Sequence, residues 1–457
     1  MTPSPPPHRH RTSLTVALLF SLVTAVGGGV AVVAPATAET TTATAPEVFR
    51  TYSGPAGLRA EMEQIARQYP AITKLETIGR SGRGVPIQAL KVTRDANHVT
   101  DGRRPSVLYV GAQHAREWIT PEMVRRLMRE VVTGYGLDSG WTRAVDTTEL
   151  WFLPVANPDG YDYTFTSGNR EWRKNLRDND GDGKITEVDG VDLNRNFDSR
   201  WGYDDEGSSP DPSDETYRGP EAASEPETRS LSALFDRIRF TFMVNYHSAA
   251  ATMMYGNGWQ VDTAEPDDQV AQALLGSEEK PAVPGYRPQR FAQQYTSNGD
   301  SAMYAQEKAG TIGLGIEMGT CEDAAGSEPD DRWEPSTCPS VFDFPDDEKL
   351  IQAEYAKNVP LARAVAASAL TPANPSHRSG GPPPRWCYAV RHLVRNRPGG
   401  GRDRATLTDR PAPALPDQRR GRAHRPGFGL ARWYAVRRPG GEALRRVPGY
   451  RAGPATG

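Results

Sequence analysis

Two histidines and a glutamate are the residues of this chain best suited to chemistry. His114 and Glu117 are three residues apart, and His247 lies 130 residues beyond Glu117. Two nitrogens and one carboxylate are a ligand set for a catalytic zinc ion that keeps one coordination position open. Taken alone, the His-x-x-Glu spacing also fits an unrelated surface pair, so the prediction depends on the surrounding sequence.

Both ligand segments follow apolar runs that are typical of strands. Val107–Gly111 precedes His114, and Phe240–Tyr246 leads directly into His247. Ligand sites in open α/β sheets lie beyond the carboxyl ends of strands. The pattern therefore predicts a single metal site at that edge of a sheet.

Alternating helical and strand-like patterns between residues 48 and 371 predict an α/β domain with helices covering a sheet. The amphipathic segment Leu58–Ala66 and the segment Ile119–Val132 are expected to be helical. Pro121 falls near a helix start, where its missing N–H is not needed. Further segments are expected as strands at Val107–Val110, Leu150–Val155, Phe240–Tyr246 and Ile312–Ile316, and as a closing helix at Asp347–Leu370.

The chain has 457 residues, 37% hydrophobic content and a net charge of −3, which allows one large domain with appendages and indicates no nucleic-acid partner. A basic start, an apolar stretch Leu14–Val33 and a small-residue site ending at Ala38 predict an export signal over residues 1–38. A short linker follows at 39–47. A membrane anchor is the alternative, but three glycines interrupt the apolar run, so we expect a secreted protein that leaves the membrane after cleavage.

Cysteine usage fits an oxidising compartment. Cys321 and Cys338 flank a short acidic loop that a disulfide could close, and Cys387 is left over. Cys387 lies in the tail 372–457, which has eighteen arginines, no lysine and four acidic residues among many Pro and Gly. This composition predicts disorder. A shifted reading frame explains it equally well.

Six further segments occur along the chain, in the order Gly111-Ala112-Gln113-His114-Ala115-Arg116-Glu117-Trp118, Pro154-Val155-Ala156-Asn157-Pro158-Asp159-Gly160-Tyr161, Trp172-Arg173-Lys174-Asn175, Gly190-Val191-Asp192-Leu193-Asn194-Arg195-Asn196-Phe197, Asn245-Tyr246-His247-Ser248 and Gly315-Ile316-Glu317-Met318-Gly319. In sequence and in order, they resemble segments of the zinc carboxypeptidases of the pancreatic A and B types and the bacterial T type. The resemblance, closest to T-type secreted enzymes, implies a mixed eight-stranded twisted sheet flanked by helices, spanning a catalytic domain 48–371. It also implies removal of single C-terminal residues from peptides.

The resemblance assigns roles to individual residues. His114, Glu117 and His247 match the ligands of one catalytic zinc, and Glu317 matches the general base. A carboxylate at this place in an apolar run is costly unless it has a function or a partner. Arg173 matches the group that stabilises the developing oxyanion.

Substrate binding is assigned in the same way. Asn194 and Arg195 match the clamp for the terminal carboxylate, a role that suits the planar guanidinium. Tyr295 matches the mobile tyrosine that closes over substrate, and Ser248 belongs to the matching segment around His247. Asp300, with Ala302 beside it, falls where the family places the pocket for the leaving side chain, although a solvated acid or a helix cap is the alternative. The combination implies mixed specificity for hydrophobic and basic residues.

A second metal site is possible in the acidic segment that begins at Asp178. The acids Asp178, Asp180 and Asp182, with glycines between them, have the spacing of a calcium loop. Position twelve is Asp189 rather than glutamate, and a plain acidic turn is the alternative. Calcium here would brace the loop that leads to the carboxylate clamp.

The sequence therefore predicts a secreted, monomeric zinc metallocarboxypeptidase acting on peptide or protein C-termini. A peptidase of bacterial cell-wall peptides is the alternative within the same family. A secreted binding protein without catalysis is a further alternative, although each expected catalytic residue is present.

Overall fold

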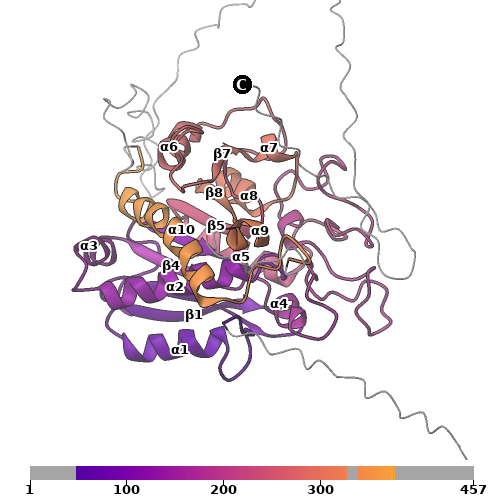
Figure 1. Ribbon diagram of the computed structural model, residues 1–457, viewed down its shortest axis with the longest axis horizontal. Coiled ribbons are helices and arrows are strands. Elements are labelled where there is room, and N and C mark those ends of the chain that lie inside the picture. Colours follow the sequence, from indigo (N-terminus) through magenta and orange to yellow (C-terminus); the bar gives the residue numbers. More distant parts are fainter. Residues whose placement is uncertain (1–47, 327–337, 374, 376–457) are drawn as a thin grey trace, which may run out of the picture. The chain divides into compact units, whose positions relative to one another are not determined.

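The computed structural model describes residues 48–326, 338–373 and 375. The expected export signal, the linker and nearly all of the tail 372–457 lie outside the described residues. The described part is built on one mixed eight-stranded sheet with strand order β1-β2-β4-β3-β5-β8-β6-β7 (Figure 1). Its strands are β1 (Thr73–Arg80), β2 (Pro86–Val92), β3 (Ser106–Val110), β4 (Glu149–Leu153), β5 (Phe242–Ser248), β6 (Thr252–Tyr255), β7 (Arg287–Arg290) and β8 (Ile312–Met318).

The centre of the sheet is parallel, and its flanks contain antiparallel pairs. β4, β3, β5 and β8 run parallel to one another, while β1 with β2, β2 with β4, and β6 with β8 pair antiparallel. Parallel central strands are buried on both faces and read as continuous apolar runs. Because their carboxyl ends meet at one edge, residues that follow β3 are brought beside the ends of β5 and β8.

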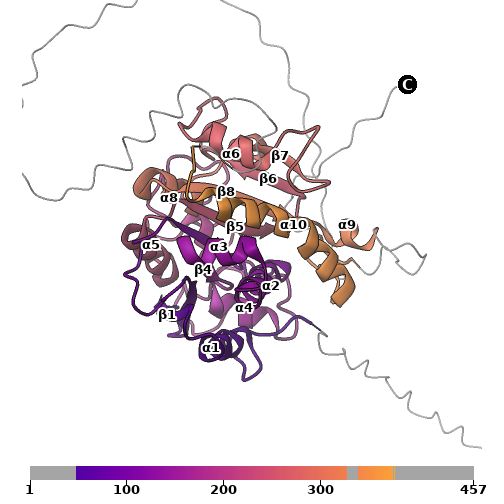
Figure 2. The ribbon, with the colours of Figure 1, turned by 90° about the vertical axis from the view of Figure 1, so that its left-hand side faces the viewer.

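Helices cover both faces of the sheet. α2 (Ile119–Gly134) packs on β3, β4 and β5, whereas α8 (Ser301–Ala309) packs on β5 and β8, and α5 (Pro226–Ile238) on β1. Figure 2 shows α5 and α8 on one side of the strands and α2 and α10 on the other. The remaining helical elements are α1 (Leu58–Gln68), α3 (Ser139–Thr147), α4 (Pro158–Thr164), η1 (Leu193–Arg195), α6 (Asp268–Leu275), α7 (Phe291–Gln294), α9 (Cys321–Ala325) and α10 (Glu348–Ser368).

Alternation along β3 divides the core into two layers. Val107 and Tyr109 belong to the apolar cluster on one face, and Leu108 and Val110 belong to the cluster on the other. Successive side chains of a strand point to opposite faces, so a single buried strand contributes to both layers. This double burial holds the central strands in place and, with them, the loops that follow their ends.

The predicted elements are found in the structure. The apolar runs form β3, β4, β5 and β8, and the three predicted helices form α1, α2 and α10. Pro121 lies in the first turn of α2, as expected, and Asp347 caps α10 by accepting hydrogen bonds from the backbone N–H of Lys349 and Leu350. Pro360, which lies inside α10, does not end that helix. Among the described residues, no helix has the length and apolar character needed to cross a membrane.

A cluster of ion pairs around Asp101, which includes the buried Lys91, links β1, β2 and α5. Lys91 of β2 is completely buried, and its Nζ donates to Asp101 Oδ1 at 2.6 Å and to the carbonyl of Val99 at 2.8 Å. Asp101 also pairs with Lys74 of β1 and Arg237 of α5. Burial opposes ionisation of Asp101, but hydrogen bonds from the two lysines outweigh it and lower its pKa to about 2.

We predict that Asp101→Asn lowers the free energy of unfolding by about 3 kcal/mol, because it leaves the Lys91 ammonium buried without a counter-charge. Lys74→Ala is the matched control, since the Lys74 side chain is 36% exposed and such a pair contributes about 1 kcal/mol at most. Urea titration measures both.

The folded-state pKa of Asp101 lies below its unfolded value. Its stabilising contribution is therefore present above about pH 4 and is lost as the pH falls toward 2. The Asn variant should lack this pH dependence. Equal losses in the Asp101 and Lys74 variants would contradict the central role given to Lys91.

Candidate active site and metal centre

The segment between β3 and α2 carries two of the predicted ligands. After Val110 the chain turns through Ala112, which adopts a left-handed φ of 42°, a conformation that costs about 1 kcal/mol for a residue with a side chain. Its N–H donates to Thr120 Oγ1 at 2.8 Å, and the N–H of Ala115 donates to the carbonyl of Arg173 at 3.0 Å. These contacts hold the turn that directs His114 and Glu117 across the strand ends.

The register between β5 and β8 places the predicted ligand His247 beside the predicted base Glu317. His247 pairs with Glu317 across the parallel strands. Equivalent positions on neighbouring strands point to the same face. The third predicted ligand and the predicted base therefore face the same cavity, as the ends of the two apolar runs indicated.

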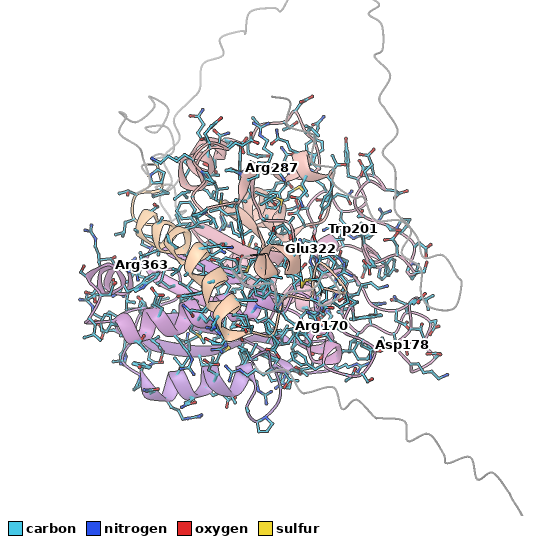
Figure 3. The ribbon with its side chains drawn as sticks, viewed as in Figure 1. Arg170, Asp178, Trp201, Arg287, Glu322 and Arg363 are labelled. Carbon is cyan, nitrogen blue, oxygen red and sulfur yellow. A yellow bond between two sulfur atoms is a disulfide. The ribbon has the colours of Figure 1, made fainter. Side chains whose placement is uncertain are left out.

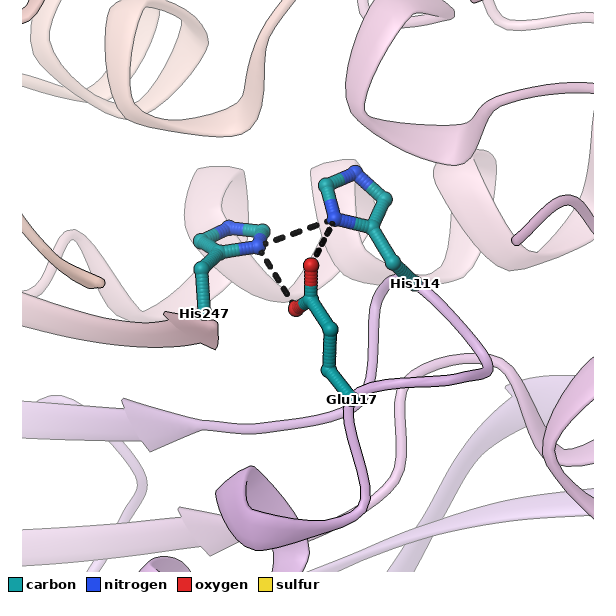
Figure 4. A group of neighbouring side chains, drawn as sticks. All are labelled: His114, Glu117 and His247. Carbon is teal, nitrogen blue, oxygen red and sulfur yellow. Dashed lines mark hydrogen bonds and ion pairs between the residues drawn. The ribbon is translucent and has the colours of Figure 1, made fainter. Parts of the chain in front are cut away.

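His114, Glu117 and His247 converge on one point (Figure 4). His114 Nδ1 lies 2.7 Å from Glu117 Oε1, and His247 Nδ1 lies 3.1 Å from Glu117 Oε2 and 3.2 Å from His114 Nδ1. Ligand atoms at about 2.0–2.1 Å from a tetrahedral zinc are about 3.3 Å apart. The three side chains, all buried, are therefore spaced as zinc ligands.

Electrostatics favour a cation at this point. Burial opposes ionisation of Glu117, but the two imidazoles outweigh it and hold the pKa of this carboxyl well below its usual range. Burial lowers the pKa of His114, so its neutral, metal-binding form is favoured. Burial also opposes protonation of His247, but Glu117 outweighs it and raises the pKa of His247, so this histidine must release its proton when a metal binds. A charged carboxylate and a neutral imidazole are the protonation states that zinc requires.

Asp192 is a buried partner of this centre that the sequence prediction did not assign. Its Oδ1 lies 3.3 Å from His114 Nε2, and its Oδ2 accepts from Arg173 Nε and Nη2 at 3.0 and 2.7 Å. A carboxylate on the second ring nitrogen orients a metal-binding histidine with Nδ1 toward the metal. Asp192 lies in the Asp-Leu-Asn-Arg segment already singled out, but nothing in that segment indicates contact with a histidine 78 residues earlier.

The predicted carboxylate clamp follows Asp192 in η1. Arg195 is 2% exposed, its Nη1 donates to the Asn194 carbonyl at 2.7 Å, and its Nη2 donates to the hydroxyl of Tyr295 at 3.1 Å. Tyr295 is half exposed. Arg195 therefore provides a fixed positive charge beside Tyr295, whose side chain is accessible to solvent.

One pocket brings several of these groups together, although Glu117, Arg173 and Asp192 are not among the residues that line it. It is lined by His114, Asn194, Arg195, Asn245, His247, Met254, Phe291, Tyr295, Ser297, Asp300, Ser301, Ala302, Gly315 and Glu317. Burial raises the pKa of Glu317 to about 7, which suits a group that must accept and release a proton near neutral pH.

Asp300 has two roles in this pocket. Its Oδ1 accepts from the N–H of Met303 and so caps α8, whereas its Oδ2 is buried and has no hydrogen-bond partner among the described residues. Burial raises the pKa of this carboxyl. The cap and the pocket acid, which the sequence left as alternatives, are therefore combined in one side chain.

Phe291, the first residue of α7, lines the pocket beside β8. A Cβ added to Gly315 would lie 2.5 Å from the Phe291 ring and 3.4 Å from Met254 Cε, so the ring occupies the space that a side chain on β8 would fill. Phe291 was not predicted, because its contact with Gly315 joins segments that are distant in sequence.

Comparison with known proteins identifies the family. Residues 58–337, more than half of the chain, match the family described as zinc carboxypeptidase. The chain belongs to the zinc carboxypeptidase family. It is 37% identical over 201 residues to human carboxypeptidase B, covering 43% of this chain and 45% of that protein. It is 32% identical over 238 residues to metallocarboxypeptidase A of Trichophyton tonsurans, covering 50% and 54%.

Solved structures show the same fold. Thrombin activatable fibrinolysis inhibitor superposes with a TM-score of 0.58 at 21% identity, over 70% of this chain and 74% of that chain. Carboxypeptidase A from Helicoverpa armigera gives 0.55 at 24%, over 71% and 74%. The chain spans about half the length of the curated relatives that it matches. These curated relatives are eukaryotic proteins named carboxypeptidase A or B. They support membership of the family, but they do not show the predicted closeness to T-type enzymes.

Two other predictions have a place in this zinc carboxypeptidase fold. Cys321 and Cys338 form the predicted disulfide, with Cα atoms 5.7 Å apart, directly after β8. Ser248 ends β5, and its buried hydroxyl has no hydrogen-bond partner in the part of the chain that the structure describes, but Ser248 is not among the residues that line the pocket. Its assignment to substrate binding stays a prediction.

The acidic loop gathers three of its four predicted calcium ligands. Asp178, Asp180 and Asp182 lie close enough to share a cation, and all are exposed; Asp178 lies at the periphery in Figure 3. Asp189 is outside this group, and its carboxylate accepts hydrogen bonds from the N–H groups of Asn179 and Thr186. Its part in calcium binding stays a prediction.

Calcium binding to this loop stays a prediction. If it binds, calcium at about 100 times its dissociation constant should stabilise the fold by about 2.7 kcal/mol, seen as a higher thermal midpoint than with magnesium. Asp180→Asn with Asp182→Asn should abolish the calcium-dependent difference. A midpoint that calcium leaves unchanged in the wild-type protein would identify the loop as a plain acidic turn.

Proposed function

We propose that this protein is a metallocarboxypeptidase that hydrolyses the C-terminal peptide bond of peptides and proteins with one zinc ion. The observation that carries the proposal is the shared pocket. It contains two zinc ligands, Glu317 and the clamp of Asn194 and Arg195. A clamp for a terminal carboxylate next to a hydrolytic centre restricts cleavage to the last bond of a chain.

The chemistry divides between the metal and the protein. Zinc held by His114, Glu117 and His247 would act as a Lewis acid that polarises the carbonyl and makes a water acidic near neutral pH. Glu317 takes a proton from the attacking water and passes it to the leaving amine, a cycle that a pKa near neutrality favours. Protonated Glu317 cannot act as the base, so activity should fall on the acid side of the pH profile.

Substrate is held on both sides of the scissile bond. Arg195 and Asn194 bind the terminal carboxylate, and Tyr295 closes over the substrate from its half-exposed position. Arg173, oriented by two hydrogen bonds to Asp192, donates to the oxyanion that develops as water attacks. A donor already fixed in place stabilises the transition state without the cost of reorganisation.

The pocket supports mixed specificity. Met254 and Phe291 offer apolar surface, and Asp300 Oδ2 offers an acceptor without a partner. Hydrophobic and basic C-terminal residues should both be released, whereas Asp and Glu would meet the charge of Asp300 in a pocket of low dielectric. Asp300 and Ala302 are also the basis for the likeness to T-type enzymes.

We also propose that the protein is secreted as a monomer. The disulfide between Cys321 and Cys338 supports an oxidising compartment, and the export signal is read from the sequence alone.

We predict that Glu317→Gln keeps one zinc per chain and lowers kcat by about 10²–10⁴-fold. The amide removes the proton acceptor and leaves the ligand triad unchanged. Glu322→Gln on α9 is the control, since this side chain is exposed and should leave turnover unchanged. Zinc analysis and hydrolysis of a blocked dipeptide test both; more than a few per cent of activity in Glu317→Gln would rule out this base.

We predict that Asp300→Asn lowers kcat/KM for a C-terminal Arg substrate at least tenfold, about 1.4 kcal/mol. Asparagine is also a good N-cap, so α8 should persist and a C-terminal Leu substrate serves as the internal control. The ratio of kcat/KM for the two substrates is measured in each protein. If both fall together, Asp300 does not contact the leaving side chain.

A further inference from the structure

Ser301 contacts the carboxylate clamp from the start of α8. Its backbone N–H donates to Asn194 Oδ1 at 2.9 Å, and its Oγ lies 3.0 Å from the same oxygen. Ser301 is the first residue of α8, after the cap Asp300. The first N–H groups of a helix have no partner within the helix, so Asn194 satisfies one of them from outside.

This contact determines how the Asn194 amide is turned. The oxygen and nitrogen of an amide are told apart by their hydrogen-bond partners. A backbone N–H can only donate, so the Asn194 atom that faces it must be the oxygen. The NH₂ group is therefore the other end of the amide, and Asn194 lines the pocket. That orientation leaves the NH₂ free to donate to a substrate carboxylate.

The Ser301 hydroxyl also joins the clamp to the metal centre. Ser301 Oγ lies 3.1 Å from Gln113 Oε1 and 3.1 Å from Asn245 Nδ2. Gln113 precedes the ligand His114, and Asn245 is two residues before His247 on β5. All of these groups are buried, where a hydrogen-bonded polar network is costly to leave partly unpaired. One hydroxyl thus contacts the clamp and both ligand-bearing segments.

We propose that Ser301 is a positioning residue that holds the Asn194 amide with its NH₂ group toward the substrate carboxylate. The proposal rests on the proposed function, because it assigns Asn194 to the clamp. The backbone N–H of Ser301 sets the orientation of the amide. The hydroxyl fixes the clamp relative to the zinc ligands, and so the distance from the terminal carboxylate to the bond that is cleaved.

Ser301→Pro is the decisive variant. Proline lacks the N–H, and it is favoured at the first position of a helix. The preceding residue must be extended, and Asp300 already is, with φ −87° and ψ 159°. The substitution therefore removes both donors to Asn194 at a position where the helix tolerates it. Ser301→Ala is its matched control, which removes the hydroxyl and keeps the N–H.

Binding of N-acetyl-L-phenylalanine and of its amide to the zinc-loaded proteins is measured by calorimetry. The ratio of the two affinities isolates recognition of the carboxylate. We expect this ratio to fall at least tenfold in Ser301→Pro and less than about threefold in Ser301→Ala. With a peptide substrate, KM should rise in Ser301→Pro by more than kcat falls. A wild-type ratio in a folded Ser301→Pro protein would overturn the proposal.

Asn194→Asp tests the same orientation if the proline variant does not fold. It is isosteric, keeps an oxygen toward the Ser301 N–H and replaces the NH₂ by a second oxygen. Affinity for the acid should fall at least tenfold while that for the amide is retained; equal affinities in variant and wild type would overturn the proposal. The wild-type protein could bind the acid more tightly than the amide and yet cleave no peptide. In that case the proposed function fails, and the role of Ser301 stands.

Discussion

The Asp192 carboxylate is the contact on which the rest of the site depends. It lies beside the second ring nitrogen of His114, accepts two hydrogen bonds from Arg173, and accepts the N–H of Asn194 where η1 begins. Burial opposes its ionisation, but Arg173 and His114 outweigh it and keep its pKa well below the usual range. The zinc ligand His114, the proposed oxyanion donor Arg173 and the turn of the proposed clamp therefore share one buried negative charge. Moving any one of them would leave that charge without part of its hydrogen bonding, which is costly in a buried site.

The elements that could be predicted are those whose own residues cause them to form, through a continuous apolar run or a helix-start signal. β3, β5 and β8 are buried on both faces, so their apolar runs marked them, and α2 and α10 have clear starts. The strands β1, β2, β6 and β7 were not predicted, and β1 and β7 are the edges of the sheet. β7 reads Arg-Pro-Gln-Arg, with proline as its only apolar residue. It is a strand because it pairs with β6, and this pairing cannot be read from three polar residues and a proline.

The same division holds in the site. The zinc ligands and Glu317 stand at the ends of strands, where an unusual residue after an apolar run is visible in the sequence. Contacts between distant segments were not visible, among them those of Ser301 with Gln113 and of Asp192 with His114. Asp189 shows the converse, because its spacing fits a calcium loop while its carboxylate is committed to backbone N–H groups. Spacing indicates which atoms are available, and packing determines what they contact.

The two glycines of β8, Gly313 and Gly315, have a consequence for how the pocket can change its shape. Gly313 lies against Ala302 and Gly315 against Phe291, so Glu317 is the one residue of β8 whose side chain lines the pocket. The side chains that lie against the two glycines are instead Phe291 of α7 and Ala302 of α8. Both helices precede β8 in the sequence. Substitutions in α7 and α8 can therefore resize the pocket while Glu317, the proposed general base, keeps its place in the sheet. Under the proposed function, most of the side chains that shape the pocket and the proposed base lie on different elements of the fold.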